Sequence, residues 1–192
     1  PAQALVMLLV EGQIESDTIG YNGPARIYSH SVTPFVARKH VTLSPEGIAV
    51  EPTRCEAKTR THIKDVDVTC RSRCVEQIAW RRTWKQKPAA EAEAARKAER
   101  RVSRRVDEEA DPRLQQAQEN YLQKIRQPLL ERDLFPQPMV LQTTSEALSM
   151  WMTQKGHGGL AAPNTPSAIA GENGAIVLQV HQSWINNLTQ GL

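Results

Sequence analysis

One segment of this chain is too polar to share a hydrophobic core with the sequence on either side of it. Between Arg71 and about Asp133 the chain is dense in Arg, Lys, Glu, Gln and Ala, with the spacing of a helix. The flanking sequence contains the alternating and continuous apolar runs that are typical of strands. This arrangement predicts an α+β fold, in which a long charged helix or helical hairpin is inserted into a mostly antiparallel β-sheet.

The N-terminal part reads as a meander of strands. Leu5 to Val10 is a continuous apolar run, and the next residues alternate between polar and apolar. Tyr21-Asn22-Gly23-Pro24 and Ser44-Pro45-Glu46-Gly47 are turn sequences, because Gly and Asn accept positive φ and Pro fixes its own φ. We therefore expect about four antiparallel strands in this part of the chain.

The central helical segment is expected to begin near Asp65 or Asp67, either of which could cap it. Its middle has only a thin apolar stripe, at Ala94, Ala98, Val102 and Val106. Asp111-Pro112 resembles a cap followed by the first residue of a second helix. The sequence leaves two possibilities open, an antiparallel helical hairpin or one long bent helix.

The remaining sequence predicts a hairpin, a linker rich in Gly, Pro and Ser, a strand over Ala175 to Val180, and a short helix capped by Ser183. The chain begins at Pro1 rather than at Met, and we expect it to be a piece of a longer protein. The predicted divisions are a strand meander, a long helical segment, a β-hairpin, a flexible linker, and a strand with the start of a helix, at residues 1–65, 66–134, 135–155, 156–174 and 175–192.

Three cysteines allow several readings. A disulfide from Cys55 to Cys70 or Cys74 would link the sheet to the helix, as in a secreted or envelope protein. A zinc site that adds His62 is the second reading, although zinc ligands usually have tighter paired spacing. Ordinary reduced thiols are the third. We predict no metal site and keep the three cysteines as disulfide candidates.

The sequence contains no catalytic motif. The five histidines are scattered, there is no Gly-x-Ser-x-Gly elbow, and the clustered carboxylates of Asp107, Glu108 and Glu109 read as a solvated turn. No cofactor is predicted, and we expect a protein that is not an enzyme. The longest apolar run, Ala4 to Val10, is far shorter than the roughly 20 residues of a spanning helix.

The central segment has an uneven charge. Between Arg71 and Arg105 there are twelve Lys and Arg residues against four Glu. Several of the arginines recur at helical spacing and would form a row of cations suited to phosphate groups or to an acidic partner. This row is a candidate polyanion-binding or protein-binding face, made of Arg96, Arg100, Arg101, Arg104 and Arg105.

The chain ends in a predicted strand, Ile176 to Val180, followed by His181-Gln-Ser-Trp-Ile-Asn-Asn-Leu188. This element, with the Tyr21 to Pro24 turn, is similar to uncharacterised bacterial envelope-type proteins, and it faintly resembles the tubular lipid-binding (BPI-like) superfamily. That resemblance implies a curved sheet around a long helix, with an apolar ligand between them. The charged central helix departs from the family, whose helix has a strong apolar face.

These observations predict a non-enzymatic structural or binding module of the bacterial envelope, with a lipid or another envelope protein as partner. The location would be periplasmic or envelope-associated, with the cytoplasm as the alternative. A helical module that binds protein or nucleic acid through its arginine row is the alternative function. The candidate apolar ligand site is the amphipathic helix face made of Tyr121, Leu122, Ile125 and Leu129.

Overall fold

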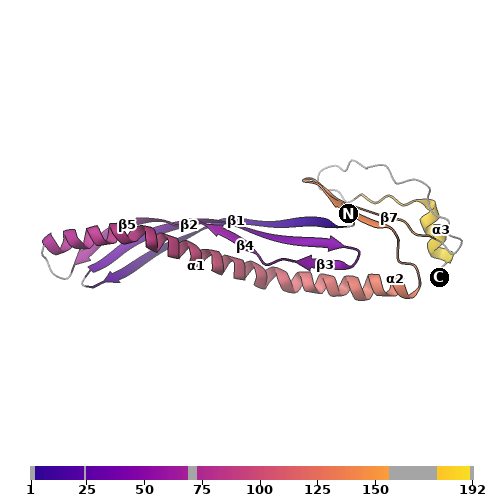
Figure 1. Ribbon diagram of the computed structural model, residues 1–192, viewed down its shortest axis with the longest axis horizontal. Helices are drawn as coiled ribbons and strands as arrows, with labels where there is room; N and C mark the ends of the chain where they lie inside the picture. Colours follow the sequence, from indigo (N-terminus) through magenta and orange to yellow (C-terminus); the bar gives the residue numbers. More distant parts are fainter. Residues whose placement is uncertain (1–2, 24, 69–72, 156–176, 191–192) are drawn as a thin grey trace. The chain divides into compact units, whose positions relative to one another are not determined.

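The computed structural model describes residues 3–23, 25–68, 73–155 and 177–190; the side chains of residues 73–75, 188 and 190 lie outside the description. The α+β prediction is confirmed, because antiparallel strands are combined with one long helix (Figure 1). The chain divides into two units. The sheet unit comprises Met7–His40 and Glu51–Ala110, and the C-terminal unit comprises Pro1–Val6, Val41–Val50 and Asp111–Leu192.

Long strands dominate the sheet unit. Strands β1 (Ala4–Asn22) and β2 (Ala25–Ser44) are neighbours in the sheet, and Gly23 takes a φ of 61° in the turn between them. The short strands β4 (Arg54–Ala57) and β5 (Arg60–Val68) pair antiparallel with β2. Strand β2 is therefore central, with β1 on one side of it and β4 and β5 on the other.

Pro34 lies within β2, which continues through it. Proline has no backbone N–H and is normally excluded from central strands. The register pairs Phe35 with Ala57 and Val32 with Arg60. The gap between β4 and β5 therefore lies opposite Pro34, where the partner strand makes no regular ladder.

Helix α1 (Arg73–Tyr121) is continuous. In the sheet unit its first turns pack on a small core of Ala25, Ile63 and Val66, to which Ala79 and Trp80 contribute. Thr83 is buried there, and its hydroxyl donates to the carbonyl of Ala79. The charged side chains on the opposite face of this part of the helix are exposed to solvent.

The helix begins later than the sequence predicted. Asp65 and Asp67 do not cap it, because both lie in β5, in register with Tyr28 and Arg26. Val66 between them is a buried core residue, so burial favours the strand here. Asp111 and Pro112 lie inside α1 and do not start a second helix, so the hairpin alternative is wrong.

The C-terminal unit contains strand β3 (Gly47–Val50), the end of α1, the π-helical segment η1 (Leu122–Arg126) and α2 (Gln127–Glu131). The predicted hairpin is present as β6 (Met139–Thr143) and β7 (Leu148–Met152). Helix α3 (Gln182–Gln190) starts one residue before Ser183, and His181 Nδ1 accepts the Ser183 backbone N–H at 3.2 Å. The cap is therefore His181 rather than Ser183.

The predicted strand over Ala175 to Val180 is not formed in its described part, residues 177–180. Val177, Leu178 and Val180 are exposed there. An apolar run needs a neighbouring strand to pair with, and these residues pair with none of the described strands. The predicted linker, residues 156–174, lies outside the described residues.

Candidate functional site

Helix α1 closes one edge of the sheet with side-chain oxygens. In the sheet unit, Glu91 accepts the backbone N–H of Thr61 at 2.6 Å and Glu99 accepts that of Ala57 at 3.1 Å. Asp107 accepts the N–H of Thr53, also at 3.1 Å. We call this row of three contacts the helix clamp. An unpaired N–H on a strand edge would otherwise recruit another strand, so the clamp blocks pairing at this edge.

The spacing of the clamp follows from elementary geometry. Its carboxylates recur every eight helix residues, which is a rise of about 12 Å at 1.5 Å per residue. Its N–H groups recur every four residues of an extended chain, which is about 13 Å at 3.3 Å per residue. The helix and the strand edge run in opposite directions, and the similar distances between successive contacts let all three form. The period of eight does not match the helical repeat, so the contact line winds around α1.

The last contact of the clamp includes an ion pair between a buried lysine and a partly exposed aspartate. Lys39 of β2 is 1% exposed, and its Nζ lies 2.6 Å from Asp107 Oδ1. Lys39 Nζ also donates to the carbonyl of Glu51 at 3.1 Å, and the Thr53 hydroxyl donates to Asp107. Burial raises the pKa of Asp107, but the hydrogen bonds from Lys39 and Thr53 outweigh this and leave that pKa below its usual value.

The other edge of the sheet has no such clamp among the described residues. Among the strands that the structure describes, β1 pairs with β2 alone. Four consecutive apolar residues of β1 are exposed, Met7 by 49%, Leu8 by 38%, Leu9 by 51% and Val10 by 40%. Because successive side chains of a strand point to opposite faces, this part of β1 exposes apolar side chains to solvent on both faces of the sheet. We call Met7–Val10 the apolar edge.

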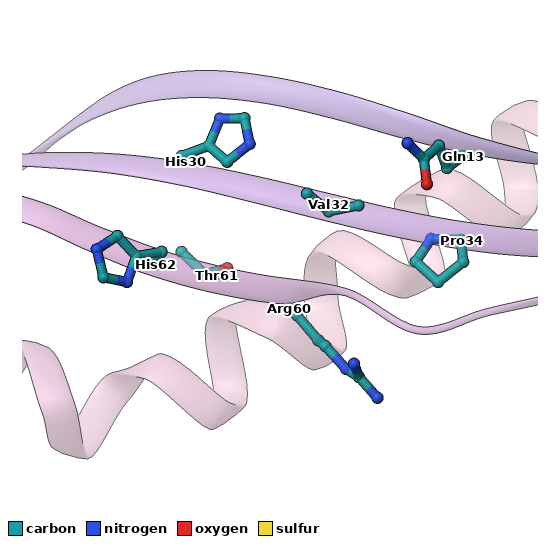
Figure 2. A pocket seen from close by; sticks show the side chains of 7 residues that line it. All are labelled: Gln13, His30, Val32, Pro34, Arg60, Thr61 and His62. Carbon is teal, nitrogen blue, oxygen red and sulfur yellow. The ribbon is translucent and has the colours of Figure 1, made fainter.

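A shallow depression of about 490 Å³ lies on the face of the sheet unit (Figure 2). His30 and His62 come from neighbouring strands and are in register. Figure 2 shows the His30 ring turned toward β1, where Asp17 Oδ1 lies 3.1 Å from its Nδ1, while Arg60 extends away from the strands. The depression is lined by Gln13, His30, Val32, Pro34, Arg60, Thr61 and His62.

The carboxylate beside the depression, Asp17, is engaged in ion pairs. Asp17 binds both Lys64, at 2.7 Å, and His30, and hydrogen bonds first from Lys64 and then from His30 lower the Asp17 pKa. Its carboxylate is therefore held as an anion and suits ion pairing rather than proton transfer. Among the described residues no group of three or more His, Cys, Asp or Glu is placed to hold a metal ion.

The candidate apolar ligand residues lie where α1 meets η1 and α2, in the C-terminal unit. Tyr121 donates its hydroxyl to the Pro45 carbonyl at 2.8 Å, and burial raises the Tyr121 pKa. Leu122 and Leu129 are half-buried, whereas Ile125 is exposed. No described contact joins the four side chains around a common cavity, and their role stays a prediction.

The candidate polyanion-binding residues are exposed on α1. Arg104 Nε lies 3.6 Å from Glu108, and Arg105 Nε lies 2.6 Å from Glu109. These pairs between residues four apart reduce the positive charge of that part of the row. The row itself, Arg96, Arg100, Arg101, Arg104 and Arg105, stays a candidate polyanion surface.

Cys55 has a free, half-buried thiol, and its pKa is raised first by burial and then by the charges of Glu99 and Glu56. A raised pKa lowers the fraction of reactive thiolate at neutral pH. Cys70 and the side chain of Cys74 lie outside the described residues, so the predicted disulfide stays a prediction.

Among the described helices, none has both the length and the hydropathy of a membrane span. Comparison with known proteins gave no relative from which a role could be inferred: no family model, no curated protein and no solved structure matches the chain. The two edges of the sheet differ, since one is clamped by α1 and the other is exposed and apolar.

Sequence reasoning missed the helix clamp and its ion pair. The local sequence predicts a solvated turn at Asp107, which instead lies inside α1, and it gives no sign of a role for Glu91, Glu99 or Lys39. The available signal was the match between a period of eight in the helix and a period of four in the strand edge. That match becomes visible only once the two elements are known to lie side by side.

Proposed function

We propose that this chain is a non-enzymatic binding module of the bacterial envelope, and that its binding surface is the apolar edge, Met7–Val10. One observation supports this most directly. The sheet unit closes one edge with partly buried hydrogen bonds to carboxylates, and leaves four consecutive apolar residues exposed on the opposite edge strand. An exposed apolar edge strand is unfavourable in an isolated protein and is characteristic of a surface that pairs with something else.

The contacts of α1 favour this surface over a ligand held between sheet and helix in the sheet unit. From Glu91 to Asp107 the helix meets the strands through carboxylates that bind backbone N–H groups. A cavity for an apolar ligand needs apolar walls. An apolar ligand at Tyr121, Leu122, Ile125 and Leu129 is a separate proposal for the C-terminal unit.

The envelope location rests on the resemblance of the C-terminal sequence to envelope-type proteins. Fractionation of cells that produce the protein would place it in the periplasmic or membrane-associated fraction. Recovery in the cytoplasmic fraction would support the alternative location and would leave the binding surface to be tested on its own.

Native mass spectrometry of the purified chain tests the binding role, beside a denatured sample of the same preparation. We expect mass above that of one chain, which is lost on denaturation and is absent for Leu9→Glu. Ile19→Glu is the matched control, because Ile19 lies on β1, is 53% exposed and lies outside the apolar edge. A bare chain mass for the wild type at every concentration would contradict the proposal.

The arginine row remains the alternative function, as a face for protein or nucleic acid. The exposure of all five arginines on one helix supports it. Affinity for an unstructured polyanion such as heparin should then fall steeply with salt and be lost in Arg100→Glu/Arg101→Glu. Binding that does not change with salt would exclude this alternative.

A further inference from the structure

We propose that the partner of the apolar edge is a second copy of this chain, which pairs antiparallel with β1 so that Leu8 of one copy lies opposite Leu8 of the other. This inference rests on the proposed function, since it names the partner of the same surface. The proposed strand pairing joins two sheets edge to edge across a two-fold axis and leaves both helix clamps intact.

The backbone of β1 is ready to pair along its free edge. The Leu5 N–H binds the Thr143 hydroxyl at 3.2 Å, so it is not used in pairing with β2. Because N–H groups alternate between the two edges of a strand, those of Met7 and Leu9 also face away from β2. An antiparallel partner would satisfy these two groups by pairing Met7 of one copy with Leu9 of the other.

The charge pattern of β1 selects the direction of pairing. The apolar edge is followed by Glu11, Glu15 and Asp17 on the same face of the strand. Parallel pairing in register would set each of these carboxylates beside its own copy, and like charges directly opposite are unfavourable. Antiparallel pairing about Leu8 puts uncharged residues opposite one another from Met7 to Leu9, and carries the acidic residues away from the axis in both directions.

The register about Leu8 is also favoured over its neighbour. A two-fold axis normal to the sheet must place a residue opposite its own copy, because opposed side chains share a face. An axis at Leu9 would put Met7 opposite Glu11 and would desolvate a carboxylate against a thioether. The axis at Leu8 keeps the pairs from Val6 to Val10 apolar, and it moves Glu11 outward to a position opposite Leu5, whose N–H already binds Thr143.

The same carboxylates disfavour an anionic lipid surface as the occupant. Membrane-surface segments that bind acidic lipids place Lys and Arg beside their apolar residues. Here the residues that follow the apolar edge are acidic. The β1 strand of a second copy, running antiparallel, suits the apolar edge better. It offers apolar side chains to pack against and backbone groups to hydrogen-bond with.

One pair of strands buries less area than a standard interface of about 1,600 Å², so we expect a weak dimer with a Kd on the order of micromolar. Sedimentation velocity from about 1 µM to about 100 µM tests this. The wild type should shift from monomer to dimer across the range. Leu8→Lys and Leu8→Glu should each remain monomeric, because each places like charges across the axis, and an equimolar mixture of the two should form a dimer.

The direction of pairing is tested by a second mixture, Met7→Lys with Leu9→Glu, which should form a heterodimer only if the strands are antiparallel. A monomeric wild type throughout, or single Leu8 variants that associate like the wild type, would overturn the proposal. Failure of the Leu8 mixture would overturn the register. Rescue by mixing shows that both variants are folded, and Ile19→Glu should dimerise like the wild type.

The outcomes also separate this inference from the proposed function. A wild type that stays monomeric, and yet carries a bound ligand that Leu9→Glu loses in native mass spectrometry, would overturn the dimer and support the binding module. A chain that shows neither association nor bound mass would overturn both.

Discussion

Lys39 is the largest side chain that is fully buried in the part of the chain that the structure describes. Its ammonium is stabilised by Asp107 and by the carbonyl of Glu51. Burying two charges is costly, and a buried pair adds little net stability over apolar residues. What the pair does provide is position, because it fixes one point of α1 against β2.

Asp107→Ala should be destabilising, since it removes the carboxylate that binds the Lys39 ammonium and the N–H and hydroxyl of Thr53. We expect a loss of about 1–3 kcal/mol in the free energy of unfolding, measured by urea denaturation. Glu108→Ala is the control, because Glu108 is exposed and pairs only at the surface with Arg104; it should cost at most about 0.5 kcal/mol. Equal effects of the two substitutions would show that the Lys39 pair does not hold the helix.

The same carboxylate predicts a dependence on pH. A carboxyl group whose pKa is lower in the folded state stabilises that state above the unfolded pKa of about 3.9, and this stability is lost as the pH falls through the folded pKa. When the pH is lowered from about 6 toward about 3, the free energy of unfolding of the wild type should therefore fall by more than that of Asp107→Asn. Parallel stability curves for the two proteins would contradict the assignment.

At the scale of elements, the helix clamp should be detectable one contact at a time. Glu99→Ala removes the acceptor of the Ala57 N–H and should accelerate exchange of that amide by about 10-fold, the equivalent of about 1.4 kcal/mol. Glu99→Gln keeps an acceptor oxygen and should show a smaller change. Glu93→Ala, whose carboxylate binds Lys97 on the solvated face, should leave Ala57 unchanged in hydrogen-exchange NMR.

Pro88 tests whether the helix is continuous. A proline inside a helix removes one hydrogen bond and costs about 3 kcal/mol relative to alanine. Since Pro88 is exposed and lies in the interior of α1, Pro88→Ala should stabilise the sheet unit by about 1–3 kcal/mol. If a helix instead began at Pro88, the substitution would be neutral or unfavourable in thermal and chemical unfolding.

The sequence predicts the elements of this fold better than their contacts. Its periodicity predicts the long helix, the β6–β7 hairpin and the half-buried stripe of Ala94, Ala98, Val102 and Val106. It does not predict the helix start, because an Asp can cap a helix or sit in a strand, and burial of Val66 decides between these. The clamp residues could not be predicted, since a carboxylate that binds a distant N–H has the same local sequence as one in water.

At the scale of the whole molecule, the account depends on a difference between the two edges of one sheet. One edge is closed within the chain by Glu91, Glu99 and Asp107. The other is apolar and is proposed to close only between two chains. A protein built in this way limits strand addition, because a dimer joined through β1 covers the apolar edge of each copy and the clamp blocks the opposite edge of each sheet.

Hydrogen-exchange NMR at low and high protein concentration tests this difference most directly. The amides of Thr53, Ala57 and Thr61 should be protected at every concentration, because their acceptors belong to the same chain. The amides of Met7 and Leu9 should exchange rapidly in dilute protein and become protected as the concentration rises. Rapid exchange of the Thr53, Ala57 and Thr61 amides would contradict the helix clamp. Rapid exchange of the Met7 and Leu9 amides even at high protein concentration would contradict the pairing of two chains.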